Sequence, residues 1–171
     1  MKKMKPAHLI QLGLAVVATA ALAEEKPVFE CVVKETKIRV FMSEAEFDPG
    51  HHTVERKPGA YGPETLYIDG TAPIGSDNQI PEISWGRFAV SWDDKEVPIP
   101  LSLYNSYYHP NIDENAIKNR LLTFTVDPHG DWIQIVMSGS DGGGAYLVGW
   151  ELRRDGEHRL FDPSRLYRHP S

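Results

Sequence analysis

The chain has 171 residues, 41% of them hydrophobic and 25% charged, with a formal net charge of −6 at pH 7. This length and composition are typical of one folded domain, and the acidic excess argues against nucleic acid and anionic membranes as partners. A single cysteine excludes an intrachain disulfide, so packing must stabilise the fold.

Residues 1–23 have the three parts of a secretory signal peptide. Three lysines among the first five residues precede an apolar run, and the run ends in Ala21-Leu22-Ala23, the small-residue pattern at which signal peptidase cleaves. The run is shorter than the roughly 20 residues of a membrane span. We therefore expect residues 24–171 to be exported as one domain to the periplasm or the extracellular space, without membrane attachment after cleavage.

The mature chain begins with an alternating pattern that predicts a β-hairpin. Phe29, Cys31 and Val33 alternate with polar residues before a polar turn, and the pattern resumes at Ile38. Pairing Val33 with Ile38 would place the hydrophobic residues of both strands on one face. This position predicts that Cys31 is a buried, inert thiol.

Residues 43–83 interrupt the regular pattern and are rich in glycine and proline. At most a short strand at residues 66–69 is expected there, so the segment is predicted to be a long, loop-rich insertion. It contains His51 and His52, with Glu55 nearby, which are side-chain types that bind transition metals.

A second hairpin is predicted over residues 84–104. Trp92 should pair with Val97 across the turn at 93–96, and Pro98 and Pro100 then lie on alternate positions of the second strand. Because proline has no N–H, this strand, expected over 97–103, should lie at a sheet edge. Residues 105–120 follow as a second long loop, with one helical turn that begins at Asn111 or Asp113.

The C-terminal part is predicted to be a meander with three turns. Hydrophobic residues of 122–126 oppose those of 133–137, which in turn oppose those of 146–150, and Asp155-Gly156 begins a last hairpin. Residues 127–131 contain two aspartates and a histidine, but Asp, Pro and Gly are turn formers, so we interpret them as a turn. Residues 139–144 form a glycine-rich loop without a phosphate-loop motif.

These hairpins predict an all-β, antiparallel sandwich or partly closed barrel of about eight or nine strands. When strand directions are followed, tight turns collect at one end and the loops 43–83, 105–120 and 139–144 collect at the other. Since binding residues concentrate on loops that a rigid scaffold holds, the loop end is where we expect a site.

The favoured hypothesis is a non-catalytic exported protein that binds a carbohydrate or a cell-envelope protein through these loops. Aromatic side chains combine apolar area with a polar group, which suits sugar rings and protein partners. The residues expected to bind are Tyr107, Tyr108, His109, Asp141 and Trp85. Alternation along the strands places Trp85, like Trp132, on the face opposite the core.

The alternative hypothesis is a small periplasmic hydrolase or a metal-binding protein. It requires His51 or His52 to meet His109 and Asp141, with Asp113 as a further carboxylate, because titratable groups must converge for catalysis or metal binding. No cofactor is expected under the favoured hypothesis, and a divalent metal is expected under the alternative.

Overall fold

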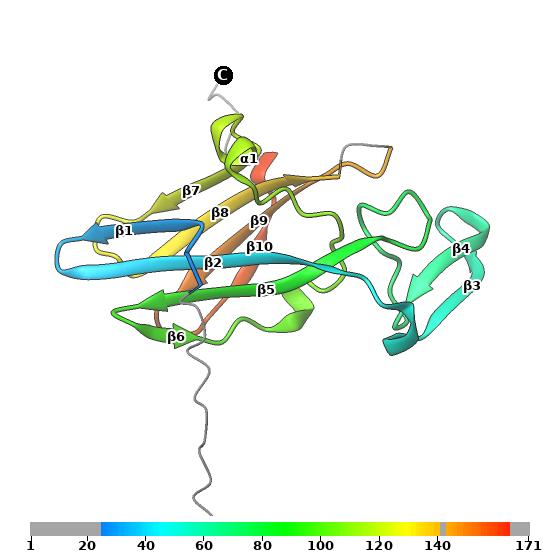
Figure 1. Cartoon of the computed structure of the whole chain (residues 1–171), viewed down its shortest axis with the longest axis horizontal. Helices are drawn as coiled ribbons and strands as arrows, with labels where there is room; N and C mark the ends of the chain where they lie inside the picture. Colours follow the sequence, from blue (N-terminus) through cyan, green and yellow to red (C-terminus); the bar gives the residue numbers. More distant parts are fainter. Residues whose placement is uncertain (1–24, 141–142, 165–171) are drawn as a thin grey trace, which may run out of the picture.

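The computed structural model describes residues 25–140 and 143–164, which form a two-layered antiparallel β-sandwich with a separate hairpin (Figure 1). One sheet has the strand order β1-β2-β5-β6 and the second has the order β10-β9-β8-β7, while β3 and β4 pair with each other. The strands are β1 (Phe29–Val33), β2 (Thr36–Glu46), β3 (Val54–Gly59), β4 (Gly62–Ile68), β5 (Ile83–Trp92), β6 (Lys95–Val97), β7 (Leu122–Val126), β8 (Trp132–Gly139), β9 (Tyr146–Arg153) and β10 (Arg159–Phe161). The predicted all-β class is confirmed, and the sandwich is the architecture observed.

The core lies between the two sheets and takes alternate side chains from both. Trp150 is fully buried and donates its indole N–H to the carbonyl of Leu103 at 2.8 Å. Trp92 is 2% exposed and donates to the carbonyl of Gly130 at the same distance. Both large rings are therefore buried without an unpaired donor, which would otherwise destabilise the core.

The meander has the predicted register. Phe124 of β7 pairs with Ile135 of β8, and Ile135 pairs with Trp150 of β9. Leu160 of β10 then pairs with Trp150 from the other side. The alternation of hydrophobic residues was therefore sufficient to position three consecutive strands.

The first hairpin differs from its predicted register by two residues. Val33 pairs with Thr36 rather than Ile38, because the turn contains only Lys34 and Glu35. A shift of two residues keeps each side chain on its predicted face. Cys31 is half-buried rather than buried, since β1 is an edge strand, and burial followed by the charge of Glu30 raises the pKa of its thiol.

The register of the second hairpin also differs from the prediction by two residues. Trp92 pairs with Lys95 rather than Val97 across a two-residue turn, in which Asp93 and Asp94 have φ of 49° and 64°, the conformation of a type I′ turn. The edge position of β6 is confirmed, but the strand ends at Val97 instead of continuing to Leu103. Pro98 and Pro100 lack the N–H that would extend the ladder, and Leu101–Leu103 forms a 3₁₀ turn.

A β-bulge at Gly86 overturns the predicted orientation of Trp85. Ser43 pairs with Arg87 and Glu44 pairs with Trp85, so Gly86 has no partner on β2. One extra residue reverses the alternation. Trp85 therefore stacks on Phe88 at 5.2 Å and packs on the core side of the sheet.

The 43–83 segment is more ordered than its composition predicts. It contains the β3–β4 hairpin, whose Leu66 and Ile68 are buried with Phe47 and Tyr108 in a second, small hydrophobic cluster. Figure 1 shows this hairpin extending beyond the sandwich. The predicted helical turn is confirmed as α1 (Glu114–Lys118), which begins after Asp113, whose carboxylate caps the N–H of Ala116.

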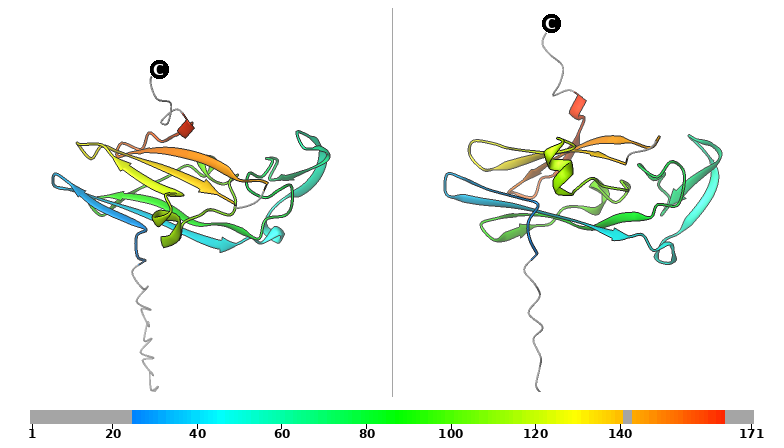
Figure 2. Two further views of the ribbon diagram at one scale, coloured as in Figure 1. Left: turned by 90° about the horizontal axis from the view of Figure 1, so that it is seen from above. Right: turned by 45° about the horizontal axis from the view of Figure 1, so that its top comes forward.

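The two ends of the sandwich differ, as predicted. At the turn end, short connections of the two sheets meet, and Arg154 of the β9–β10 turn makes an ion pair with Asp93 of the β5–β6 turn at 2.8 Å. At the loop end, the chain between β4 and β5 lies beside the β3–β4 hairpin, whereas α1 of the 105–120 segment lies further along the sandwich, near β7 (Figure 2). The predicted signal peptide lies outside the described residues, and no described helix has the length and hydrophobicity to cross a membrane.

Candidate functional site

Backbone hydrogen bonds join the three long loops at the loop end. Ile74 donates to the carbonyl of Ser106 and accepts from the N–H of Tyr108, both at 2.8 Å, which forms a short parallel bridge. Ser140 donates to the carbonyl of His109 at 2.9 Å. The described parts of the three loops are therefore connected around residues 74, 106–109 and 140, at the end of the sandwich expected from strand direction.

A cavity of about 410 Å³ opens in this surface, and we call it the tyrosine pocket. It is lined by Tyr61, Pro73, Ile74, Gly75, Asp77, Asn78, Gly143, Gly144, Ala145 and Tyr146. Tyr61 lies at the tip of the β3–β4 hairpin and is 68% exposed. Tyr146 is the first residue of β9, so the two rings come from different sheets.

Two glycines make room for the ring of Tyr146. A Cβ on Gly139 would lie 2.0 Å from its Cζ, and a Cβ on Gly75 would lie 2.6 Å from its Cε1. The hydroxyl is buried and has no hydrogen-bond partner among the described residues, and burial strongly raises its pKa. Tyr146 is therefore a fixed, uncharged wall of the pocket.

The loop that holds Asp77 is attached to the β3–β4 hairpin through Asn78. The Asn78 side chain accepts from the N–H of Leu66 at 2.7 Å and donates to the carbonyl of Glu64 at 3.2 Å. Asp77 and Asn78 have φ of 52° and 60°, a region that Asp and Asn tolerate better than most residues. Asp77 is exposed, and its carboxylate has no hydrogen bond or ion pair with another described residue.

A second cavity of about 220 Å³ adjoins the first and shares Gly75 and Asp77 with it. We call it the histidine pocket, because His109 lines it. Its other lining residues are Ser76, Gln79, Ile80, Glu82 and Ser140. The half-buried His109 has φ of 50°, and its backbone N–H donates to the carbonyl of Ile83 at 3.2 Å.

The predicted aromatic residues lie deeper than expected. Tyr107 is half-buried and packs against Tyr146 with ring centroids 5.2 Å apart. Tyr108 is 5% exposed, and desolvation followed by the charge of Asp69 raises its pKa to about 12. Tyr108 is therefore buried rather than exposed, and Trp85 of β5 is half-buried and packs against the main hydrophobic core instead of lying on the outer face.

The histidines of the metal hypothesis are engaged with local carboxylates. His52 stacks on Phe47 and lies 2.7 Å from the Asp69 carboxylate, whose pKa is lowered by hydrogen bonds from His52 and the N–H of Thr53. His51 lies 3.3 Å from the carboxylate of Asp48. The described part of the chain brings no three His, Cys, Asp or Glu side chains together as a metal site.

Two residues of the alternative hypothesis remain. Asp113 serves as the N-cap of α1, and Asp141 lies outside the described residues. Glu55 lies 3.1 Å from Lys57 on its own strand.

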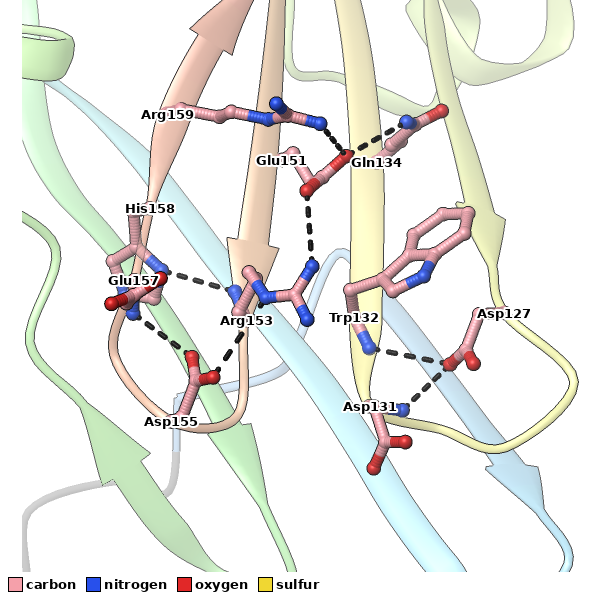
Figure 3. Close-up of polar contacts among 10 residues, drawn as sticks. All are labelled: Asp127, Asp131, Trp132, Gln134, Glu151, Arg153, Asp155, Glu157, His158 and Arg159. Atoms are coloured by element: carbon pink, nitrogen blue, oxygen red, sulfur yellow. Dashed lines mark hydrogen bonds and ion pairs between the residues drawn. The ribbon is translucent and has the colours of Figure 1, made fainter.

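A further polar cluster, which the sequence did not suggest, lies on the outer face of the second sheet (Figure 3). Glu151 is only 5% exposed and accepts hydrogen bonds from Arg159 at 3.0 Å, Gln134 at 3.2 Å and Arg153 at 3.4 Å. Burial opposes ionisation, but these donors outweigh it and lower the pKa of Glu151. The charges satisfy one another, so the cluster stabilises the sheet rather than offering a free site.

The predicted turn at residues 127–131 is confirmed by its hydrogen bonds (Figure 3). The Asp127 carboxylate accepts backbone N–H groups of Asp131 at 2.6 Å, His129 at 3.1 Å and Trp132 at 3.2 Å. Burial opposes ionisation of Asp127, yet these bonds lower its pKa. This aspartate therefore holds a turn together.

Comparisons with protein-family models, curated proteins and solved structures found no match to this chain. The candidate site therefore rests on geometry. Sequence inspection located its loops and His109 but missed Tyr61, Asp77 and Tyr146 as pocket residues. The available signal was the glycines at positions 75 and 139, which leave space for an aromatic ring.

Proposed function

We propose that the protein is an exported, non-catalytic binding protein that holds a carbohydrate in the tyrosine pocket. The observation that carries this proposal is the combination of two tyrosine rings and an unpaired carboxylate around one cavity. Export to the periplasm or the extracellular space is proposed from the N-terminal sequence pattern.

The size and lining of the pocket suit a sugar. Ligand pockets commonly measure about 300–1,000 Å³, and the tyrosine pocket, at about 410 Å³, falls in this range. Sugars have an apolar ring face that packs on aromatic side chains and hydroxyls that need hydrogen-bond partners. Tyr61 and Tyr146 supply aromatic surface. Asp77 supplies acceptor oxygens that no other described residue uses.

The test is binding of a panel of di- and oligosaccharides to residues 24–171 by isothermal titration calorimetry. Tyr61→Ala removes an aromatic side chain that is 68% exposed, so it should leave the fold intact and weaken sugar binding about tenfold or more. Val32→Ala is the matched control, because Val32 is 63% exposed and lies in β1, outside the pocket.

Retention of full affinity in Tyr61→Ala would contradict the proposed site, and absence of binding across the panel would contradict the proposed function. Mass spectrometry of the protein from the cell envelope or medium tests export, with cleavage after Ala23 as the expected result.

A further inference from the structure

The histidine pocket contains polar groups that the fold leaves without partners. Asp77 and Glu82 are exposed, and neither carboxylate makes a hydrogen bond or ion pair within the described part of the chain. Ser76 is only 6% exposed, and its buried Oγ has no hydrogen-bond partner there either. Because buried polar groups are normally hydrogen-bonded, this hydroxyl independently indicates a missing partner.

The pocket also lacks a compensating cation among its lining residues. No lysine or arginine contributes to it, and His109 is the only basic side chain in the described lining. Arg56 reaches the same loop, but its guanidinium donates to the backbone carbonyls of Glu64 at 3.0 Å and Asn78 at 3.1 Å. Two unpaired carboxylates in a concave surface favour a positively charged ligand group.

We propose that the histidine pocket binds the protonated amine of an amino sugar whose ring occupies the tyrosine pocket. This inference rests on the proposed function, because the sugar ring is placed by Tyr61 and Tyr146. The two pockets share Gly75 and Asp77, so one ligand can occupy both. An ammonium group has three donors, which the carboxylates of Asp77 and Glu82 can accept in charge-assisted hydrogen bonds.

An organic amine suits this geometry better than a metal ion. Calcium takes six to eight oxygen ligands at short distance, and the described residues do not group three His, Cys, Asp or Glu side chains for a metal. An ammonium needs only a few acceptors, and these can be spread around the pocket.

The experiment compares three disaccharides that differ at one position: the glucosamine dimer, its N-acetylated form and the glucose dimer. Calorimetry at about pH 6, where exposed carboxylates are ionised and the sugar amine is protonated even though neighbouring oxygens lower its pKa below that of lysine, should show the free amine binding about tenfold more tightly than the other two. Acetylation removes the charge while keeping the ring, so the comparison isolates the ammonium group.

Asp77→Asn should abolish this preference, because the glucosamine dimer should lose about tenfold in affinity, whereas the neutral sugars, which lose one charged acceptor but no ion pair, should lose less. Asparagine tolerates the φ of 52° at this position, so the backbone is preserved. Glu82→Gln is a second variant expected to reduce the same preference. Asp131→Asn removes an exposed carboxylate at the turn end and is the matched control, for which the wild-type preference is expected.

The outcomes separate the two proposals. Equal affinity for all three sugars, with loss of binding in Tyr61→Ala, overturns the amine site but supports carbohydrate binding in the tyrosine pocket. A preference that depends on Asp77 but not on Tyr61 overturns the placement of the ring. An undiminished preference in both Asp77→Asn and Glu82→Gln overturns the assignment of the amine to this pocket.

Discussion

The carboxylate of Glu151 is a buried polar group that links strands of the second sheet. It lies on the outer face of β9 yet is 5% exposed, and three side chains from β8, β9 and β10 donate to it. Hydrogen bonds to a charged group contribute about 1.5–3 kcal/mol, more than neutral ones. Glu151 therefore joins three strands through one side chain.

We expect Glu151→Gln to lower the free energy of unfolding by about 2 kcal/mol, because the amide removes the charge and leaves Arg159 without an anion. Urea titration followed by fluorescence measures this. Glu157→Gln changes an exposed glutamate in the same hairpin and should have little effect. Equal stability of the two variants would show that the cluster contributes nothing beyond surface charge.

At the scale of elements, the bulge in β5 determines where the loop-end aromatics pack. A Cβ on Gly86 would lie 2.8 Å from the carbonyl oxygen of Glu44 and 2.9 Å from Oγ of Ser43. Only glycine allows β2 to approach this closely. The bulge turns Trp85 toward Tyr104 and Trp150, with ring centroids 5.7 and 5.9 Å apart.

Gly86→Ala should therefore destabilise the fold by about 1–3 kcal/mol, the range for an overpacked contact. It should also change the near-ultraviolet circular dichroism of the tryptophan cluster. Gly50→Ala is the comparison, since its new methyl group would meet only the side chain of Asp48 at 3.1 Å in an exposed turn. An unchanged tryptophan signal in Gly86→Ala would contradict the role of the bulge.

Sequence patterns predicted these elements where hydrophobic alternation was unbroken. The register of β7, β8 and β9 followed from residues such as Phe124, Ile135 and Trp150, because a one-residue slip would expose them. The predicted registers of the first two hairpins were wrong by two residues, because the alternation of hydrophobic residues is the same for a two-residue and a four-residue turn. Trp85 was predicted on the wrong face because strict alternation does not reveal that Gly86 is an unpaired bulge residue.

The sequence predicted the end of the sandwich at which the candidate site lies, but only some of the residues that line it. Strand direction identified the loop end, and His109 lies there in a pocket. Tyr61 and Asp77 were missed because their positions depend on how Asn78 fastens a loop to the β3–β4 hairpin, a contact between irregular segments. Such contacts leave no periodic pattern in the sequence.

At the scale of the whole molecule, three groups of the second sheet and its turns should make stability depend on pH. His158, in the β9–β10 connection, accepts the N–H of Arg153 on Nδ1 at 3.0 Å. Burial lowers its pKa, although the carbonyl of Pro98 beside β6 and the charge of Asp155 act in the opposite direction. The pKa values of Asp127 and Glu151 are lowered as well.

All three shifts make the folded chain bind protons less readily than the unfolded chain, so the free energy of unfolding should fall as pH falls. The contribution of His158 is lost as pH falls below about 6.5, the ordinary histidine value. Those of Glu151 and Asp127 are lost as pH falls below the ordinary values of glutamate and aspartate, about 4.3 and about 3.9. Urea unfolding from about pH 8 to about pH 2.5 measures both steps. His158→Gln should remove only the first, whereas His129→Gln, which changes an exposed histidine, should keep both. A wild-type curve that is flat between about pH 7.5 and 5.5 would contradict the assignment to His158, because an imidazole whose pKa is lowered by folding takes up its proton first in the unfolded chain, and this favours unfolding.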